Sequence, residues 1–116
     1  MNIRRIEAGK RMCQASVHGN TVYLAGQVAD DTNQDVAGQT RQVLAQIDAL
    51  LKEAGTDKSR ILFAQIVLAD IGTFADMNAV WDAWVAPGNP PARATIEGKL
   101  VAPQYKIEII VTAAVG

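Results

Sequence analysis

An arginine and a glutamate stand on two apolar segments near the C-terminus of this 116-residue chain. Arg93 lies in the stretch 90–96, PPARATI, and Glu108 lies in the stretch 105–109, YKIEI. If the two strands pair as a hairpin, both charges reach one cleft. An arginine fork binds a carboxylate through two parallel hydrogen bonds, and a nearby carboxylate can orient a water molecule. The pair predicts a site for a small anionic substrate, with a structural Arg93–Glu108 ion pair as the alternative.

The chain lacks the residues that other common catalytic mechanisms require. Cys13 is the only cysteine and His18 is the only histidine, and His18 precedes a Gly19-Asn20 turn signal. Catalysis by Ser/His/Asp or Cys/His groups therefore lacks partners, and a conventional zinc site lacks ligands. The sequence predicts no metal.

Length and charge limit the class of protein. A chain of 116 residues is expected to form a single domain over residues 1–116. Eleven basic and twelve acidic residues leave a net charge of -1. That balance makes nucleic acid an unlikely partner, because a phosphate backbone is bound through an excess of positive charge.

No stretch of the chain is typical of a targeting signal or a membrane span. The first residues lack an apolar segment, and no run approaches the roughly 18 apolar residues that a span requires. A soluble, cytoplasmic protein without a membrane partner is expected.

Periodicity predicts six strands and two helices. Strands are expected over 3–7, 14–18, 21–25, 60–69, 90–96 and 107–115, and helices over 36–54 and 74–84. Gly55 is expected to end the first helix, and Thr73 with Asp76 resembles a capping box that begins the second. The continuously apolar strand 60–69 is expected at the centre of the sheet.

The resulting order, β-β-β-α-β-α-β-β, predicts an α+β fold in which two helices cover one face of a mixed six-stranded sheet. Strands 60–69 and 107–115 carry apolar residues on both sides, and no segment remains to cover the second face. Another copy of the chain is expected to cover it.

Four motifs in this order resemble the RidA/YjgF family, also called the RutC family. They are Gly26-Gln27 at a strand end, 39–44 (QTRQVL) in the first helix, 91–93 (PAR), and 106–109 (KIEI). The match covers nearly the whole chain, and Met77-Asn78 with the stretch 81–85 (WDAWV) is closest to the YoaB branch of that family.

The resemblance implies a chorismate-mutase-like (YjgF-like) fold, a homotrimer and a site in each cleft between subunits. It implies the hydrolysis of reactive 2-imino or 2-enamino acids to 2-oxo acids and ammonia without a cofactor. Carried over, Arg93 holds the carboxylate of a small substrate, the N–H of Gly26 helps to anchor it, and Glu108 orients the attacking water. Thr95 lines the pocket.

Three positions depart from the pattern of that family. Ala25 replaces a serine, Thr95 replaces a cysteine, and Met12 stands near the place of an N-terminal aromatic residue. Ala25 and Thr95 therefore leave the preferred substrate side chain open. Two other functions also remain open: non-catalytic sensing of small 2-oxo acids in the same clefts, and a less favoured nuclease activity.

Overall fold

The computed structural model describes residues 1–116, with six strands and two α-helices in the predicted order. Short 3₁₀ turns at Lys58–Arg60 (η1) and Ile71–Thr73 (η2) precede β4 and α2. The bounds are β1 (Ile3–Ile6), β2 (Ala15–His18), β3 (Thr21–Leu24), α1 (Val36–Glu53), β4 (Ile61–Leu68), α2 (Phe74–Trp84), β5 (Ala92–Glu97) and β6 (Ile107–Ala114).

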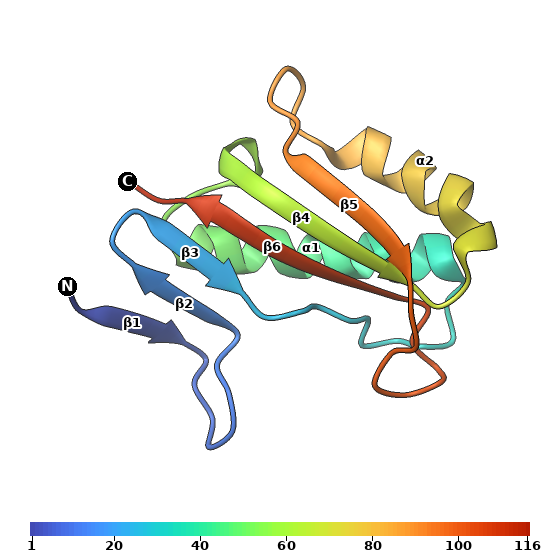
Figure 1. Cartoon of the computed structure of the whole chain (residues 1–116), viewed down its shortest axis with the longest axis horizontal. Coiled ribbons are helices and arrows are strands. Elements are labelled where there is room, and N and C mark those ends of the chain that lie inside the picture. The colour runs from blue at the N-terminus through green and yellow to red at the C-terminus, as the bar shows by residue number, and fades with distance from the viewer.

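The strands form one mixed sheet in the order β1-β2-β3-β6-β4-β5 (Figure 1). Only β4 and β5 pair in parallel, and the other neighbours are antiparallel. The predicted hairpin between β5 and β6 is therefore wrong, because β4 lies between them. The apolar β4 is an internal strand, but it lies next to the edge strand β5 rather than at the centre.

Both helices begin and end for local reasons. Asp35 caps α1 by accepting a hydrogen bond of 2.9 Å from the N–H of Gly38, and Gly55 follows the helix at φ +87°. The predicted capping box of α2 is wrong, since the side chain of Thr73 makes no capping bond. Its hydroxyl donates instead to the carbonyl of Asp70, within the preceding η2 turn.

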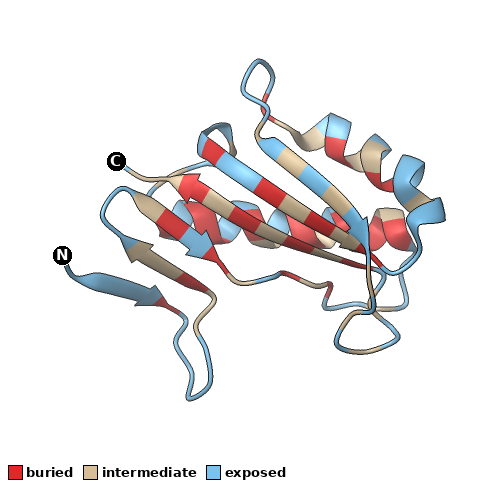
Figure 2. Cartoon of the chain, in the orientation of Figure 1, coloured by how far each residue is buried: buried red, intermediate tan, exposed pale blue.

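The core lies between the helices and one face of the sheet. Alternate residues of β6 are buried, as Figure 2 shows by the alternating colours along that strand. They belong to one buried apolar cluster with residues of both helices, among them Leu44, Ile47, Leu51, Met77 and Trp81. The helices therefore cover a single face, as predicted. Neither helix has the length and apolar run needed to cross a membrane.

The second face of the sheet is open in the single chain. Tyr23, Phe63 and Ile96 expose 52%, 41% and 47% of their surfaces. Their registers place them with Ile110 and Val67 on the side away from the helices. This face is mainly apolar, which is unusual for a surface that meets only water.

Candidate functional site

Gly26 and Glu108 lie against each other where β3 leads out of the sheet beside β6. A Cβ atom placed on Gly26 would lie 2.5 Å from Oε2 of Glu108, so only glycine leaves room for that carboxylate. Glu108 projects from the open face of β6, half-buried. The N–H of Gly26 makes no backbone hydrogen bond, so it is free to bind a ligand. The structure thus brings these two predicted site residues together.

Gln27 fixes the backbone on which Gly26 stands. Its backbone N–H donates to the carbonyl of Ile109 over 2.9 Å, and the return bond from Ile109 N–H to Gln27 is 3.1 Å. The buried side chain of Gln27 donates over 3.0 Å to both Gln14 Oε1 and the carbonyl of Ala25. Ala25 is therefore held beside the predicted site, with its short side chain in place of the expected hydroxyl.

Gln39 of α1 holds the segment of chain that precedes Glu108. Its side chain is fully buried in the first turn of α1. Its Oε1 accepts a 2.9 Å hydrogen bond from the N–H of Lys106, and its Nε2 donates over 3.2 Å to the carbonyl of Gln104. Two bonds from one amide therefore anchor the segment that leads directly into β6.

Arg93 lies on the other face of the sheet, against α2. Its register partner on β4 is Ala64, which is buried under the helices. The guanidinium carbon lies 5.2 Å from the ring centroid of Trp81 and 5.8 Å from that of Phe74. Stacking by its face leaves the N–H edge of an arginine free to bind a carboxylate. These two aromatic contacts hold the fork without using its donors.

Two unsatisfied polar atoms lie on the same side as Arg93. The Oδ1 atom of Asn78 and the Oγ1 atom of Thr95 are both buried and have no hydrogen-bond partner. Thr95 follows Arg93 by two residues on one face of β5, and Asn78 lies between Phe74 and Trp81 on the stripe of α2 that faces Arg93. Buried polar atoms without partners are uncommon, so their grouping around the arginine marks a polar site.

Arg93 and Glu108 do not meet within one chain. They lie on opposite faces of the sheet, beside Ala64 and Val67 of β4 respectively. The register separates them by about 10 Å along the strands and about 10 Å across two strand spacings. The alternative of an intrachain ion pair is therefore wrong, as is a shared cleft within one chain. Each chain thus carries two separate candidate half-sites. One consists of Gly26 and Glu108, and the other is formed around Arg93.

A cavity of about 490 Å³ adjoins the Gly26 half-site. Met12 from the β1–β2 loop lines it together with Gln14 and Gln27. Met12 thus lies close to Gly26, where the sequence pattern places an aromatic residue. The chain has no group of three or more histidine, cysteine, aspartate or glutamate side chains placed to hold a metal ion.

Sequence reasoning missed the surroundings of Arg93. Trp81 packs in the core at 5% exposure, and its ring also supports the guanidinium. Asn78 received no role from the sequence. A signal was present, since Phe74, Asn78 and Trp81 recur at helical spacing and an asparagine interrupts an otherwise apolar stripe.

Comparison with known proteins extends over the whole chain. Residues 2–115 match the protein family described as Endoribonuclease L-PSP. The RutC family protein YoaB of Escherichia coli is 47% identical over 115 residues, covering 99% of this chain and 100% of the relative. A RutC family protein of Haemophilus ducreyi is 45% identical over 113 residues, covering 97% of both chains.

Solved structures agree with this comparison. A crystal structure of an uncharacterised protein from Pseudomonas aeruginosa is 43% identical, with a TM-score of 0.96 over 99% of this chain and 100% of the other. A member of the YjgF protein family from Neisseria meningitidis is 43% identical, with a TM-score of 0.95 over 100% of this chain and 97% of the other.

Proposed function

Because the chain belongs to the Endoribonuclease L-PSP family, which includes the RutC and YjgF proteins, we propose that it hydrolyses reactive 2-imino or 2-enamino acids to 2-oxo acids and ammonia. The observation that carries the proposal is the state of Arg93. Its fork is stacked on two aromatic rings beside two unsatisfied polar atoms, and it makes no hydrogen bond within the chain. Such an arginine is prepared to bind a small carboxylate.

The chemistry requires little beyond positioning. Arg93 holds the carboxylate, and the N–H of Gly26 supplies a further donor to the substrate. Glu108 accepts a hydrogen bond from a water molecule and directs its oxygen to the carbon of the protonated C=N bond. As the C–O bond forms, Glu108 takes one proton from the water and the electron pair of the C=N double bond moves to nitrogen. That proton then passes to the nitrogen, the C–N bond breaks, and ammonia leaves. The remaining hydroxyl group loses its proton to give the carbonyl of the 2-oxo acid. Proximity and general-base assistance account for such a reaction.

The proposed site lies between copies of the chain. Arg93 stands on the edge strand β5, so Arg93 of one copy and Glu108 of its neighbour would form one cleft where the edge of one sheet packs against the open face of the next. A closed homotrimer satisfies both half-sites of every chain, since a ring has as many clefts as subunits. The exposed Tyr23, Phe63 and Ile96 support the proposal, because such residues gain by burial against another copy.

The family description names an endoribonuclease, but the residues of this chain favour the deaminase. Its net charge of -1 supplies no excess of cations for phosphates. Trp81, which could stack on a base, is 5% exposed, and Arg93 lies over the ring of Phe74. We expect no cleavage of RNA by the purified protein.

The direct test adds the protein to a reaction in which an amino-acid oxidase releases imino acids. Semicarbazide then traps the imine that remains. Wild type should accelerate imine loss. Glu108→Gln should lose about 10²–10⁴-fold in rate, and Arg93→Ala should lose more. Arg93→Lys should also be impaired, because a point charge does not reproduce the fork.

Lys52→Ala serves as the matched control, since Lys52 is exposed in the last turn of α1 and lines neither cavity. It should retain full activity. Near-normal turnover in Arg93→Ala would exclude the mechanism. A folded wild-type protein that accelerates the loss of no imine, but binds 2-oxo acids saturably, would favour the metabolite-sensing function.

A further inference from the structure

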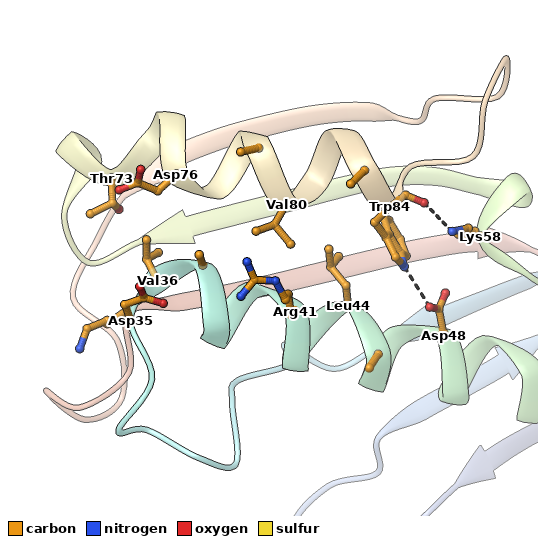
Figure 3. A pocket seen from close by; sticks show the side chains of 15 residues that line it. Asp35, Val36, Arg41, Leu44, Asp48, Lys58, Thr73, Asp76, Val80 and Trp84 are labelled. Atoms are coloured by element: carbon orange, nitrogen blue, oxygen red, sulfur yellow. Dashed lines mark hydrogen bonds between the residues drawn. The ribbon is translucent and has the colours of Figure 1, made fainter.

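A groove of about 820 Å³ lies between α1 and α2 (Figure 3). It lies on the helical side of the sheet, away from the open face that the proposed assembly buries. It contains neither Arg93 nor Glu108. The groove is therefore a separate feature, accessible from outside, and its volume is in the range of small-molecule sites.

The walls of the groove are apolar along most of its length. Val36 and Leu44 of α1 face Val80 of α2 across it, and alanines of both helices leave space between them. One end is closed by Trp84, whose Nε1 donates to Asp48 over 2.9 Å. Lys58 donates to the carbonyl of Trp84 and lies 5.2 Å from its ring centroid. The polar groups at this end are thus already paired.

Arg41 is the only arginine among the residues that line the groove. Its side chain extends from α1 between the two helices, and no hydrogen bond joins it to another lining residue (Figure 3). Asp35 and Thr73, which precede the first turns of α1 and α2, line the same end of the groove. The helices therefore run in the same direction, and their positive dipole ends add to the field near Arg41.

The remaining charges at this end decide which anion fits. Lys106, which also lines the groove, adds a positive charge, whereas Asp35 and Asp76 add two negative charges. Asp35 is already engaged with the N–H of Gly38. The two carboxylates repel a polyanion such as a nucleotide phosphate, but the Arg41 fork can hold one carboxylate. Because the walls are apolar, the ligand that carries this carboxylate also needs an apolar body.

From this geometry we propose that the groove between α1 and α2 binds a small monocarboxylate with an apolar body, with the carboxylate on Arg41 and the body between Leu44 and Val80. The site is independent of the proposed deaminase. Its ligands need no 2-imino or 2-oxo group, because the groove offers nothing that would recognise one.

The test titrates the assembled protein with 3-phenylpropionate and 4-methylpentanoate, followed by ¹H–¹⁵N NMR. Saturable shifts are expected at the amides of Ala45, Val80 and Ala83 and at the indole N–H of Trp84. Arg41→Gln should weaken binding by about tenfold or more, the loss expected for a charge-assisted hydrogen-bond pair. The uncharged 3-phenylpropionamide should lose a similar factor on the wild-type protein.

Two controls separate this site from the candidate active site. Lys52→Gln removes a positive charge from α1 outside the groove and should leave the affinity unchanged. Arg93→Ala should leave the groove shifts unchanged even if it abolishes deaminase activity. The proposal is overturned if the shifts are confined to the surroundings of Gly26 and Arg93, if no shift saturates, or if a folded Arg41→Gln binds as tightly as wild type.

Discussion

Gly26 leaves space for the carboxylate of Glu108, and this contact gives a prediction for a single methyl group. In Gly26→Ala the added Cβ would overlap Oε2 of Glu108 at 2.5 Å. The flexible end of the glutamate can move away, so the protein should fold while the carboxylate loses its position. We expect imine turnover to fall by about 10²-fold, close to the loss of Glu108→Gln.

Gly9→Ala is the matched control for that measurement, because its Cβ would meet its nearest atom at 3.6 Å, an ordinary contact. It should retain normal kcat. Full activity in Gly26→Ala would mean that the position of Glu108 does not matter for turnover.

At Asn78, a substitution that raises stability is expected to weaken substrate binding. Its buried Oδ1 has no partner within the chain, and burying such an atom costs about 1–3 kcal/mol. Asn78→Leu removes that cost, so the melting temperature should rise by about 4 °C or more. The same change removes an unpartnered polar atom from the stripe of α2 that faces the guanidinium, so KM for the imino acid should increase. A higher melting temperature with unchanged KM would separate Asn78 from the site.

At the scale of an element, the η1 turn before β4 depends on an ionised side chain. Hydrogen bonds from the hydroxyl of Ser59, and then from its backbone N–H, lower the pKa of Asp57. A lowered pKa adds stability above the ordinary pKa of an aspartate, and this contribution is lost as pH falls through the lowered value. Asp57→Ala should therefore melt slightly below wild type at neutral pH.

The difference in melting temperature should disappear in acid, where wild-type Asp57 is also protonated. Scanning calorimetry of both proteins from neutral pH down to about pH 2 tests this. A gap that stays constant across this range would assign the effect to packing rather than to the charge. Asp82→Ala is a suitable control, since Asp82 is exposed on α2.

The elements were largely predictable because each one is encoded by neighbouring residues. Val43, Ile47 and Leu51 recur at helical spacing, and Gly55 ends the helix that they define. Strand pairing was not predictable from the same local pattern. The crossover through α2 places β5 parallel to β4, and a parallel partner leaves no turn signal that could reveal it.

The site residues were predictable singly, but their arrangement was not. Arg93 and Glu108 stand out as charges on apolar strands, whereas their faces depend on a pairing that only the folded chain reveals. Gly26 was expected near the site and indeed contacts Glu108. Asn78 was missed because a half-buried asparagine on a helix has many ordinary functions, and its lack of a partner is visible only in three dimensions.

At the scale of the whole molecule, the separation of the half-sites predicts complementation between two inactive proteins. Arg93→Ala and Glu108→Gln each lack one half of every proposed cleft. After unfolding together and refolding in equal amounts, chance assembly leaves about a quarter of the clefts with both intact groups. Imine turnover should recover to about a quarter of the wild-type value.

Each variant refolded alone provides the baseline for this experiment, and native mass spectrometry confirms that mixed assemblies have formed. No recovery in confirmed mixed assemblies would show that Arg93 and Glu108 do not cooperate across two chains.

The placement of Arg93 and Glu108 on opposite faces of one sheet has a kinetic consequence. If each working cleft takes one group from each of two chains, a lone chain has no activity at all. The specific activity then falls on dilution, and the rate rises with more than the first power of protein concentration until assembly is complete. The amount of this protein in a cell would set both the number of its catalysts and the fraction of them that work.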